Sequence, residues 1–536
     1  MRILITGAAS PLGRALAAAL GTEHELRTLD AIEPGDIRLD LIGDLRDAEL
    51  CRRAVEGVEA ILHLAALYPA AGPDTPPHEL LDMVTRGGYR LMMAAAEAGV
   101  PKIVLASSLD LLRRYPHHWQ VAESWMPRPN TDPRDLSLYL AEISAREFGR
   151  TEPMRVICLR LGTLVDDEEA RRRAFDVSWL HMDDAVQAFR RALAFEPEGR
   201  LARSGWWVFH ISRGGPFARF PLAAAAQENL GFAPQHDFRD RWPEAPPRSR
   251  AQPWPQLLDA LVPETFGRIP SRPIRNVVIF GAGGPLASIT VPVLVPRYRL
   301  RLTDIRPLEE VEREAKPQSP GAPTIKLPGP PHETRIVDVT DPQQVLAACE
   351  GMDAIINCTV IRPDPVGAFK VNLIGAYNVM RAAVAHRIRR VVHTGPQLVT
   401  LQHPVGYWHD FDVPEDAPPR PGTHLYGHTK YLGQEVCRIF AEEYGLEVPA
   451  LLFSQFVNPE TAQPRPDGVF PMTVSWEDAA QAMRLALEVP SLPRPFEVFH
   501  ILTDVPHRKF RNDKAKRLLG WQPRDGLEHL WARRRE

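Results

Sequence analysis

The stretch MRILITGAASPLGRALAAAL, residues 1–20, joins a short apolar strand, a glycine turn and an alanine-rich helix. It returns as RNVVIFGAGGPLASITVPVL, residues 275–294, with Gly281 standing 274 positions after Gly7 (281 − 7). A strand that runs through a glycine turn into a helix is the opening of a parallel βαβ unit. The sequence therefore predicts one α/β fold used twice.

Later parts of the chain repeat in the same order. LHMDDAVQAFRRAL at 180–193 returns as VSWEDAAQAMRLAL at 474–487, and LGFAP at 230–234 returns as LGWQP at 519–523. Within each half, apolar runs without polar alternation are separated by helical stretches, as expected for a parallel sheet covered on both faces. The 536 residues exceed a single hydrophobic core. We expect two tandem Rossmann-type domains, each a doubly wound parallel sheet of the α/β class.

Proline and arginine mark the boundary between the halves. We expect an N-terminal domain over 1–245, a Pro/Arg-rich linker over 246–273 and a C-terminal domain over 274–536. A second Pro/Gly-rich stretch, KPQSPGAPTIKLPGPPHE at 316–333, falls inside the C-terminal domain. It is interpreted as a surface insertion after the second strand.

Charge and composition restrict the class of partner. A net charge of −3 argues against a nucleic-acid surface. No apolar run approaches the roughly 18 residues of a membrane span. Five cysteines, an odd number without CxxC spacing, predict reduced core thiols, a cytoplasmic location and no metal site. The expected partner is a small-molecule substrate.

The first glycine turn has the features of a dinucleotide site. Gly7 permits the tight turn, Gly13 permits close packing of helix on strand, and Ser10 replaces the middle glycine. A pyrophosphate would meet free N–H groups at this helix N-terminus. Asp30 ends the next strand, where a carboxylate binds the adenosine ribose hydroxyls and repels the extra phosphate of NADP. The first half is therefore expected to bind NAD.

The second glycine turn keeps fewer of these features. Gly281 and Gly284 hold the first two glycine positions and Asp304 holds the ribose position, but Ala287 replaces the third glycine. One extra methyl group at a close helix–strand contact costs about 1–3 kcal/mol by overpacking. The second loop therefore indicates NAD binding less strongly than the first.

Longer motifs accompany both turns. They include GDLRD around Asp44, HLAA at 63–66, VDVTD around Asp338, VNLIGAYNVMRAA from Val371 and YGHTK at 426–430. On these motifs each half resembles the extended short-chain dehydrogenase/reductases, the NAD-dependent epimerase/dehydratases, and is similar to uronate dehydrogenase-like members. The resemblance implies NAD as cofactor and adenine contacts from Asp44 and Asp338. It also implies backbone contacts to the cofactor from Leu64, Ala65 and Ala66.

The resemblance also implies a catalytic group: a serine or threonine after a central strand, and a Tyr-x-x-x-Lys pair on a helix. The tyrosine is the general acid/base, and the lysine lowers the tyrosine pKa. In the first half Ser108 holds the serine position and Tyr139 the tyrosine position, but Ile143 stands where the lysine belongs. The expected loss is about 10²–10⁴ in rate.

The second half has the opposite pattern. Tyr426 and Lys430 keep the i,i+4 spacing that places both side chains on one helix face. Pro396 occupies the serine position, and Thr394 lies two residues earlier on the same face of the strand. Chemistry is therefore expected in the second half rather than the first.

Two functions remain open. One is an NAD-dependent oxidoreductase or epimerase/dehydratase-like enzyme that acts on a sugar-like or hydroxylated small molecule in its C-terminal half. The other is a catalytically degenerate NAD-binding protein that acts as a sensor or scaffold, since the two halves have complementary losses. Family members commonly dimerise through the helix that carries Tyr-x-x-x-Lys. We therefore expect an internal pseudo-dimer, with helix 139–150 packed near helix 426–444.

Overall fold

The computed structural model describes residues 1–116, 119–213, 225–241, 269–318, 321–402, 412–464, 468–506 and 508–531. The chain divides into two compact units, Met1–Val262 and Pro263–Glu536. The dividing point falls within the expected linker, of which residues 246–268 lie outside the described ranges.

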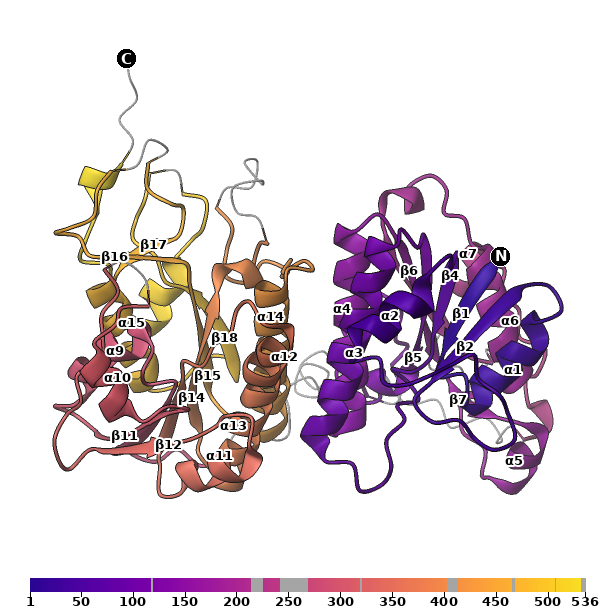
Figure 1. The fold of residues 1–536 in the computed structure, drawn as a ribbon, viewed down its shortest axis with the longest axis horizontal. Helices are drawn as coiled ribbons and strands as arrows, with labels where there is room; N and C mark the ends of the chain where they lie inside the picture. The colour runs from indigo at the N-terminus through magenta and orange to yellow at the C-terminus, as the bar shows by residue number, and fades with distance from the viewer. Residues whose placement is uncertain are drawn as a thin grey trace, which may run out of the picture. The chain divides into compact units, whose positions relative to one another are not determined.

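The first unit is a seven-stranded parallel sheet between two layers of helices (Figure 1). Its strands in spatial order are β3 (Leu41–Ile42), β2 (Glu25–Asp30), β1 (Arg2–Thr6), β4 (Ala60–His63), β5 (Lys102–Ser108), β6 (Arg155–Leu161) and β9 (Trp206–Ile211). One face carries α1 (Pro11–Leu20) and α6 (Met182–Ala194), and the other carries α2 (Ala48–Val55), α3 (Pro77–Glu97) and α4 (Pro133–Thr151). The remaining elements are η1 (Leu109–Leu112), β7 (Thr163–Val165), α5 (Asp167–Arg172), β8 (Trp179–His181), η2 (Leu201–Arg203), α7 (Ala225–Leu230) and η3 (Arg239–Arg241).

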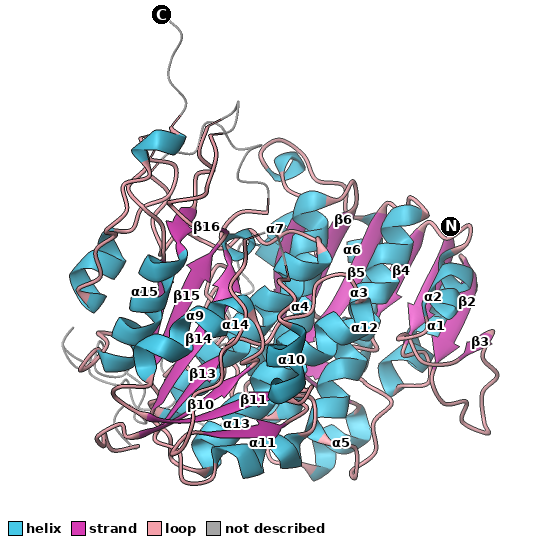
Figure 2. Cartoon of the chain, turned by 60° about the vertical axis from the view of Figure 1, so that its left-hand side comes forward, coloured by secondary structure: helices cyan, strands magenta, loops and turns pink. Residues whose placement is uncertain are grey.

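The second unit repeats this order (Figures 1 and 2). Its strands are β12 (Glu333–Ile336), β11 (Arg299–Asp304), β10 (Asn276–Phe280), β13 (Ala354–Asn357), β14 (Arg390–Pro396), β15 (Val448–Phe453) and β18 (Phe496–His500). One face carries α9 (Pro285–Leu294) and α15 (Trp476–Glu488), and the other carries α11 (Pro342–Cys349), α13 (Gly375–Ala385) and α14 (Leu425–Tyr444). The remaining elements are α10 (Leu308–Glu314), α12 (Pro365–Ala368), η4 (Phe369–Ile374), η5 (Gln397–Val399), β16 (Gln455–Val457), β17 (Thr473–Ser475), η6 (Ala515–Leu519) and η7 (Glu528–Leu530).

The apolar strands explain this architecture. Every residue of β4 and of β13 is buried, because helices cover both faces of each sheet. The strand order reverses between β1 and β4 and between β10 and β13, and ligands bind beyond the carboxyl ends of the strands at such a switch point. The expected pair of doubly wound Rossmann-type sheets is confirmed. No helix among the described residues is long and apolar enough to cross a bilayer.

The Pro/Gly-rich stretch at 316–333 is more than a surface insertion. Ile325 is 2% exposed and packs in the same apolar core as Leu308. The N–H of Leu327 donates to Glu312 Oε1 at 2.9 Å, which ties the stretch to α10. Its described part therefore packs against α10 and contributes to the apolar core of the second unit.

A close approach of α14 to η4 yields a stability prediction. A Cβ atom on Gly433 of α14 would lie 2.2 Å from the carbonyl oxygen of Asn372 in η4. Gly433→Ala is therefore expected to lower the free energy of unfolding by about 1–3 kcal/mol through overpacking, measured by denaturant titration. Gly329→Ala is the control, because a Cβ there has nothing within 4 Å. Equal stability of the two variants would contradict the proposed contact.

Candidate active site

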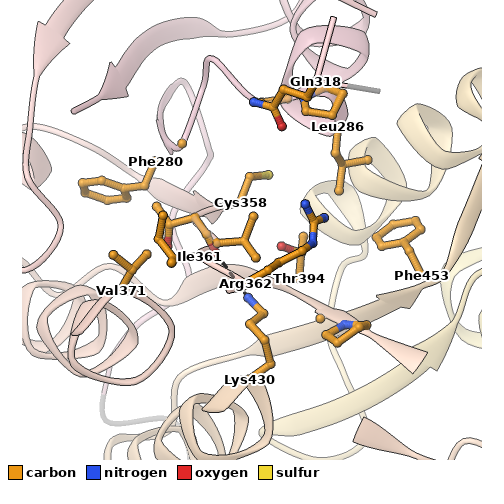
Figure 3. Close-up of a pocket in the computed structure, with 18 of the residues that line it drawn as sticks. Phe280, Leu286, Gln318, Cys358, Ile361, Arg362, Val371, Thr394, Lys430 and Phe453 are labelled. Carbon is orange, nitrogen blue, oxygen red and sulfur yellow. Dashed lines mark hydrogen bonds between the residues drawn. The ribbon is translucent and has the colours of Figure 1, made fainter. Parts of the chain in front are cut away.

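A cavity of about 1080 Å³ opens at the carboxyl ends of the central strands of the second unit (Figure 3). One end is lined by the glycine turn and the two expected nucleotide carboxylates, Asp304 and Asp338. The other end is lined by Thr394, Tyr426 and Lys430. The structure thus joins the predicted cofactor and catalytic residues of the second half in one space. Pockets of about 300–1,000 Å³ hold small ligands and cofactors.

The glycine turn leaves space at the start of α9. Gly284 is the N-cap, and no side chain caps the first N–H groups of the helix. A Cβ on Gly284 would meet only the Gly281 carbonyl oxygen, at 3.3 Å, so packing within the protein tolerates a side chain there with little adjustment. The space that this side chain would fill belongs to the cavity. Ala287, the departure from the three-glycine pattern, is fully buried in the apolar core.

The two carboxylates at this end each keep one oxygen available. Asp304 Oδ2 accepts the N–H of Gly283 at 2.9 Å, and Asp338 Oδ1 accepts the N–H of Thr340 at 2.8 Å. Asp304 Oδ1 and Asp338 Oδ2 have no hydrogen-bond partner among the described residues. Together with the uncapped helix start, these acceptors fit a bound dinucleotide.

The corresponding cavity of the first unit is far smaller. It measures about 40 Å³ and is bordered by Gly7, Asp30, Asp44, Ala65 and Ala66. The expected contact residue Leu64 is fully buried and does not line it. This volume is below the range of about 300–1,000 Å³ that is usual for pockets holding small ligands and cofactors.

The polar groups of the first turn are engaged within the protein. Ser10 Oγ donates to Gly7 O at 2.7 Å and accepts the N–H of Gly13 at 3.1 Å. Asp30 Oδ2 accepts the N–H of Ala9 at 3.0 Å, and Asp30 Oδ1 accepts the N–H of Ala31 at 2.7 Å. The expected phosphate donor and ribose acceptor thus already have partners.

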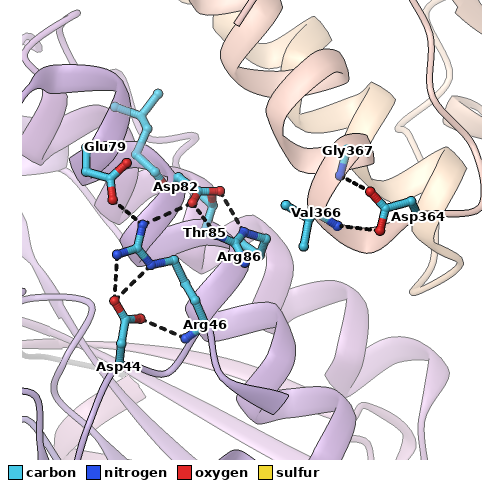
Figure 4. A network of polar contacts seen from close by, with 10 residues as sticks. Asp44, Arg46, Glu79, Asp82, Thr85, Arg86, Asp364, Val366 and Gly367 are labelled. Carbon is cyan, nitrogen blue, oxygen red and sulfur yellow. Dashed lines mark hydrogen bonds and ion pairs between the residues drawn. The ribbon is translucent and has the colours of Figure 1, made fainter.

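Asp44 is engaged in the same way. Its Oδ2 accepts from Arg46 Nη2 at 2.6 Å and from Arg46 Nε at 2.9 Å, and its Oδ1 accepts the Arg46 N–H at 2.8 Å (Figure 4). Burial opposes ionisation, but these hydrogen bonds outweigh it and lower the pKa of Asp44. The Arg46 guanidinium also contacts Glu79 and Asp82. The geometry therefore favours the second unit for NAD, the reverse of the order expected from the two loops.

The catalytic end contains a buried amine beside a tyrosine. Lys430 is 3% exposed, and its Nζ donates to Thr359 O at 3.3 Å. Burial lowers the pKa of Lys430 to about 8. Burial also raises the pKa of the half-buried Tyr426, and the neighbouring Arg362 acts in the opposite direction. Thr394 Oγ1 donates to Asn357 O at 2.9 Å, so this hydroxyl is held by the backbone.

Arg362 is the residue that sequence reasoning missed. Its guanidinium carbon lies 5.3 Å from the centroid of the Tyr426 ring, and the residue lines the cavity. It follows the end of β13, at the same strand end as the HLAA motif of the first half. That position was the available signal, because loops after these strands line the switch point.

Helix register corrects one expectation about the first half. The helix α4 has its N-cap at Asp132 and α14 has its N-cap at His424, which are 292 positions apart (424 − 132). The same interval separates Phe148 from Phe440 (440 − 148). The ring centroids of Phe148 and Tyr89 lie 5.6 Å apart, and those of Phe440 and Tyr377 lie 5.7 Å apart. The two helices are therefore equivalent without a gap.

This register changes the counterparts of the Tyr–Lys pair. Arg134 matches Tyr426 (426 − 292), Leu138 matches Lys430 (430 − 292), and Tyr139 matches Tyr431 (431 − 292). This register places Tyr139 one residue after the counterpart of Lys430 and not at the tyrosine position expected from the sequence, where Arg134 stands. The first half has lost both the tyrosine and the lysine.

The serine position fits the sequence alignment. Lys102 pairs with Ala60, and Arg390 pairs with Ala354, so β5 and β14 are 288 positions apart (390 − 102). This interval matches Ser108 with Pro396 (396 − 108). Ser108 does not line the small cavity, and its Oγ accepts the N–H of Asp110 at 3.1 Å.

A histidine pair of the first unit lies outside these sites. His181, Asp183 and His236 bring possible metal-ligating atoms within 4.8 Å of one another. His181 Nδ1, however, accepts the N–H of Asp183 at 3.2 Å as the cap of α6. The rings of His181 and His236 stack with centroids 3.7 Å apart. In stacked imidazole rings the nitrogen lone pairs lie in parallel planes and do not converge on one ion. Ring packing therefore explains the His181–His236 pair better than metal binding does.

Two Rossmann-type units, one with a Tyr–Lys pair facing a dinucleotide-sized cavity, define an enzyme of the short-chain dehydrogenase/reductase type. The model of the NAD dependent epimerase/dehydratase family matches residues 3–173 and 277–476. The chain belongs to this family, whose cofactor is NAD, and contains its domain twice.

Curated relatives match single halves in length. L-arabinose 1-dehydrogenase (NAD(P)(+)) from Haloferax volcanii is 27% identical over 274 residues, covering 47% of this chain and 97% of that protein. Uronate dehydrogenase from Pseudomonas syringae pv. tomato is 28% identical over 218 residues, covering 38% of this chain and 77% of that protein. The solved uronate dehydrogenase from Agrobacterium tumefaciens is 24% identical with a TM-score of 0.38, covering 47% of this chain and 86% of that chain.

The buried amine yields a pH-dependent prediction. Lys430→Met is expected to raise the free energy of unfolding by about 3 kcal/mol near pH 7, because a pKa of about 8 instead of 10.5 means that burial disfavours the charged form. Below pH 8 both the folded and unfolded chains hold this proton, so the gain is complete. It should shrink as pH rises from 8 to 10.5, where only the unfolded chain still holds the proton.

Denaturant titrations at several pH values measure this gain. Lys516→Met is the control, because Lys516 is only half-buried and pairs with Asp504 at 2.7 Å. A Lys430→Met gain that does not change with pH would contradict the burial argument.

Proposed function

We propose that this chain is an NAD-dependent oxidoreductase that acts on a hydroxylated small molecule in its second unit. One observation carries the proposal: a single cavity of about 1080 Å³ contains both the nucleotide carboxylates and the Tyr426–Lys430 pair. The 40 Å³ cavity of the first unit has no such pair, because Arg134 and Leu138 replace it.

Residues of the second unit would hold the cofactor. The glycine turn at Gly281 and Gly284 would accommodate the pyrophosphate against the uncapped start of α9. Asp304 would accept from the ribose hydroxyls, and Asp338 would accept from the adenine amine. A carboxylate at the Asp304 position favours NAD over NADP. When bound, NAD supplies a hydride acceptor.

Tyr426 would remove the proton from the substrate hydroxyl. The guanidinium of Arg362 beside the ring would stabilise the tyrosinate, and the family resemblance gives Lys430 the same role. The apolar wall of Phe453, Phe456 and Phe470 limits water around the reacting groups. Thr394, whose hydroxyl donates a hydrogen bond to the Asn357 carbonyl, would supply only an acceptor oxygen to the substrate.

The relatives indicate the substrate class. One is an L-arabinose dehydrogenase and another is a uronate dehydrogenase, so carbohydrates and their acids are the substrates to examine first. The first unit, without the Tyr–Lys pair, would serve as a structural partner of the second. The internal pseudo-dimer of helices 139–150 and 426–444 stays a prediction of this proposal.

Cofactor stoichiometry tests the assignment to the second unit. We expect calorimetric titration to give one NAD per chain. Asp304→Ala should weaken NAD binding about 10- to 100-fold, as for a lost hydrogen bond to a charged group, and Asp30→Ala should leave it within twofold. Asp30 is the matched control, since it ends the equivalent strand of the first unit. If Asp30→Ala weakened NAD binding and Asp304→Ala did not, the cofactor site would be assigned to the first unit instead.

Turnover tests the catalytic pair. NADH formation is followed at about 340 nm with a panel of aldoses and uronic acids. Tyr426→Phe should reduce kcat by about 10²–10⁴, the usual contribution of a general acid/base. Tyr139→Phe should leave kcat unchanged, because Tyr139 is buried and does not line the cavity. The opposite ranking of the two variants would overturn the proposal.

A further inference from the structure

The two ends of the large cavity differ in charge. Its carboxylates, Asp304 and Asp338, belong to the nucleotide end, and its cations, Arg362 and Lys430, belong to the catalytic end. None of the lining residues that the structure describes at the catalytic end is acidic. A cleft with apolar walls and unopposed positive charge concentrates anions. The catalytic end is therefore electrostatically suited to a negatively charged ligand.

Arg362 is the accessible one of the two cations. Lys430 is buried and bonded to Thr359, whereas Arg362 is exposed and extends into the cavity toward Leu286 and Phe453 (Figure 3). It forms no ion pair with any carboxylate of the described chain. Its planar fork of N–H donors matches the paired oxygens of a carboxylate or phosphate.

The acidic residue nearest to Arg362 in the sequence is engaged elsewhere. Asp364 caps α12, where its Oδ2 accepts the N–H of Gly367 at 2.6 Å and its Oδ1 accepts the N–H of Val366 at 3.3 Å (Figure 4). These bonds fix the Asp364 carboxylate to the backbone. Asp364 therefore forms no ion pair with Arg362, whose guanidinium lies beside the Tyr426 side chain and keeps further N–H donors for a ligand.

The loop that carries Arg362 is anchored. Asn372 Nδ2 donates to Ile361 O at 2.7 Å, and Asn372 Oδ1 accepts the Ile361 N–H at 3.1 Å. The same amide donates to Thr429 Oγ1 at 3.0 Å on the helix of Tyr426. The peptide before Arg362 is therefore fixed relative to the catalytic tyrosine.

The first unit lacks this cation. Gly7 lies against Ala65 in the first unit, and the equivalent Gly281 lies against Thr359 in the second. Ala65 and Thr359 are therefore counterparts, so equivalent residues of the two loops are 294 positions apart (359 − 65). The counterpart of Arg362 is then Tyr68 (362 − 294). The arginine is found only in the unit that keeps the Tyr–Lys pair.

We infer that Arg362 binds an anionic group of the substrate, a carboxylate or a phosphate, beside the hydroxyl that Tyr426 deprotonates. This inference rests on the proposed function for the identity of the site and adds the substrate class: a hydroxylated acid or phosphate ester. The guanidinium orients the substrate by its charged end while the apolar wall covers its body.

Calorimetric titration of the NAD-loaded full chain tests the inference. The probes are D-glucuronate, D-glucose 6-phosphate and neutral D-glucose. At least one anion should bind ten times or more tighter than glucose. Arg362→Ala should remove about 10- to 100-fold of that affinity, and Arg362→Lys should retain part of it. Arg381→Ala is the control, because the Arg381 guanidinium carbon lies 5.7 Å from the centroid of the Tyr377 ring and Arg381 does not line the cavity.

A second titration separates substrate from cofactor as the source of the anion. Arg362→Ala should bind NAD and ADP-ribose within twofold of the natural chain, and an equal loss for these ligands would assign the arginine to the pyrophosphate instead. Absence of anion preference in the natural chain overturns the inference even if a neutral sugar is oxidised. Anion preference without NADH formation leaves the inference standing and overturns only the proposed function.

Discussion

The backbone of each glycine turn passes so close to the neighbouring strand that no side chain fits between them. A Cβ on Gly7 would lie 2.8 Å from Ala65 N, and one on Gly281 would lie 3.0 Å from Thr359 N. Both glycines have φ near +75°, at 75° and 76°, where other residues are strained. This contact fixes where the first and fourth strands of each unit separate, and therefore where a ligand can enter the sheet.

One fold thus provides two crevices with different contents. In the first unit Ser10, Asp30 and Asp44 bond to neighbouring backbone or to Arg46, which leaves a cavity of about 40 Å³. In the second unit the corresponding glycine and carboxylates keep free space and free oxygens around a cavity of about 1080 Å³. The two crevices differ both in side-chain hydrogen bonding and in the loops around them, since Gln318 of the Pro/Gly-rich stretch lines the larger one.

The retained site is energetically unfavourable for folding. Lys430 is 3% exposed, and burial lowers its pKa to about 8. The loss of hydration therefore disfavours the charged amine that the proposed chemistry needs. Hydrogen bonding of Asn372 to Ile361 and Thr429 holds the surrounding loop and helix in place. Such a site persists because the packed sheet and helices around it over-determine its geometry.

The sequence by itself determined the duplicated fold, because strand, turn and helix are local patterns of apolar spacing and glycine placement. It also located Gly281, Gly284, Asp304, Tyr426 and Lys430, whose motifs have fixed spacing. It did not determine which crevice is open, since the partners of Asp30 and Asp44 depend on rotamers and loop paths. It misaligned Tyr139, because a single motif cannot fix a helix register that the Tyr89–Phe148 contact sets. It also missed Arg362, because only tertiary structure brings the loop after β13 over a tyrosine 64 residues later (426 − 362).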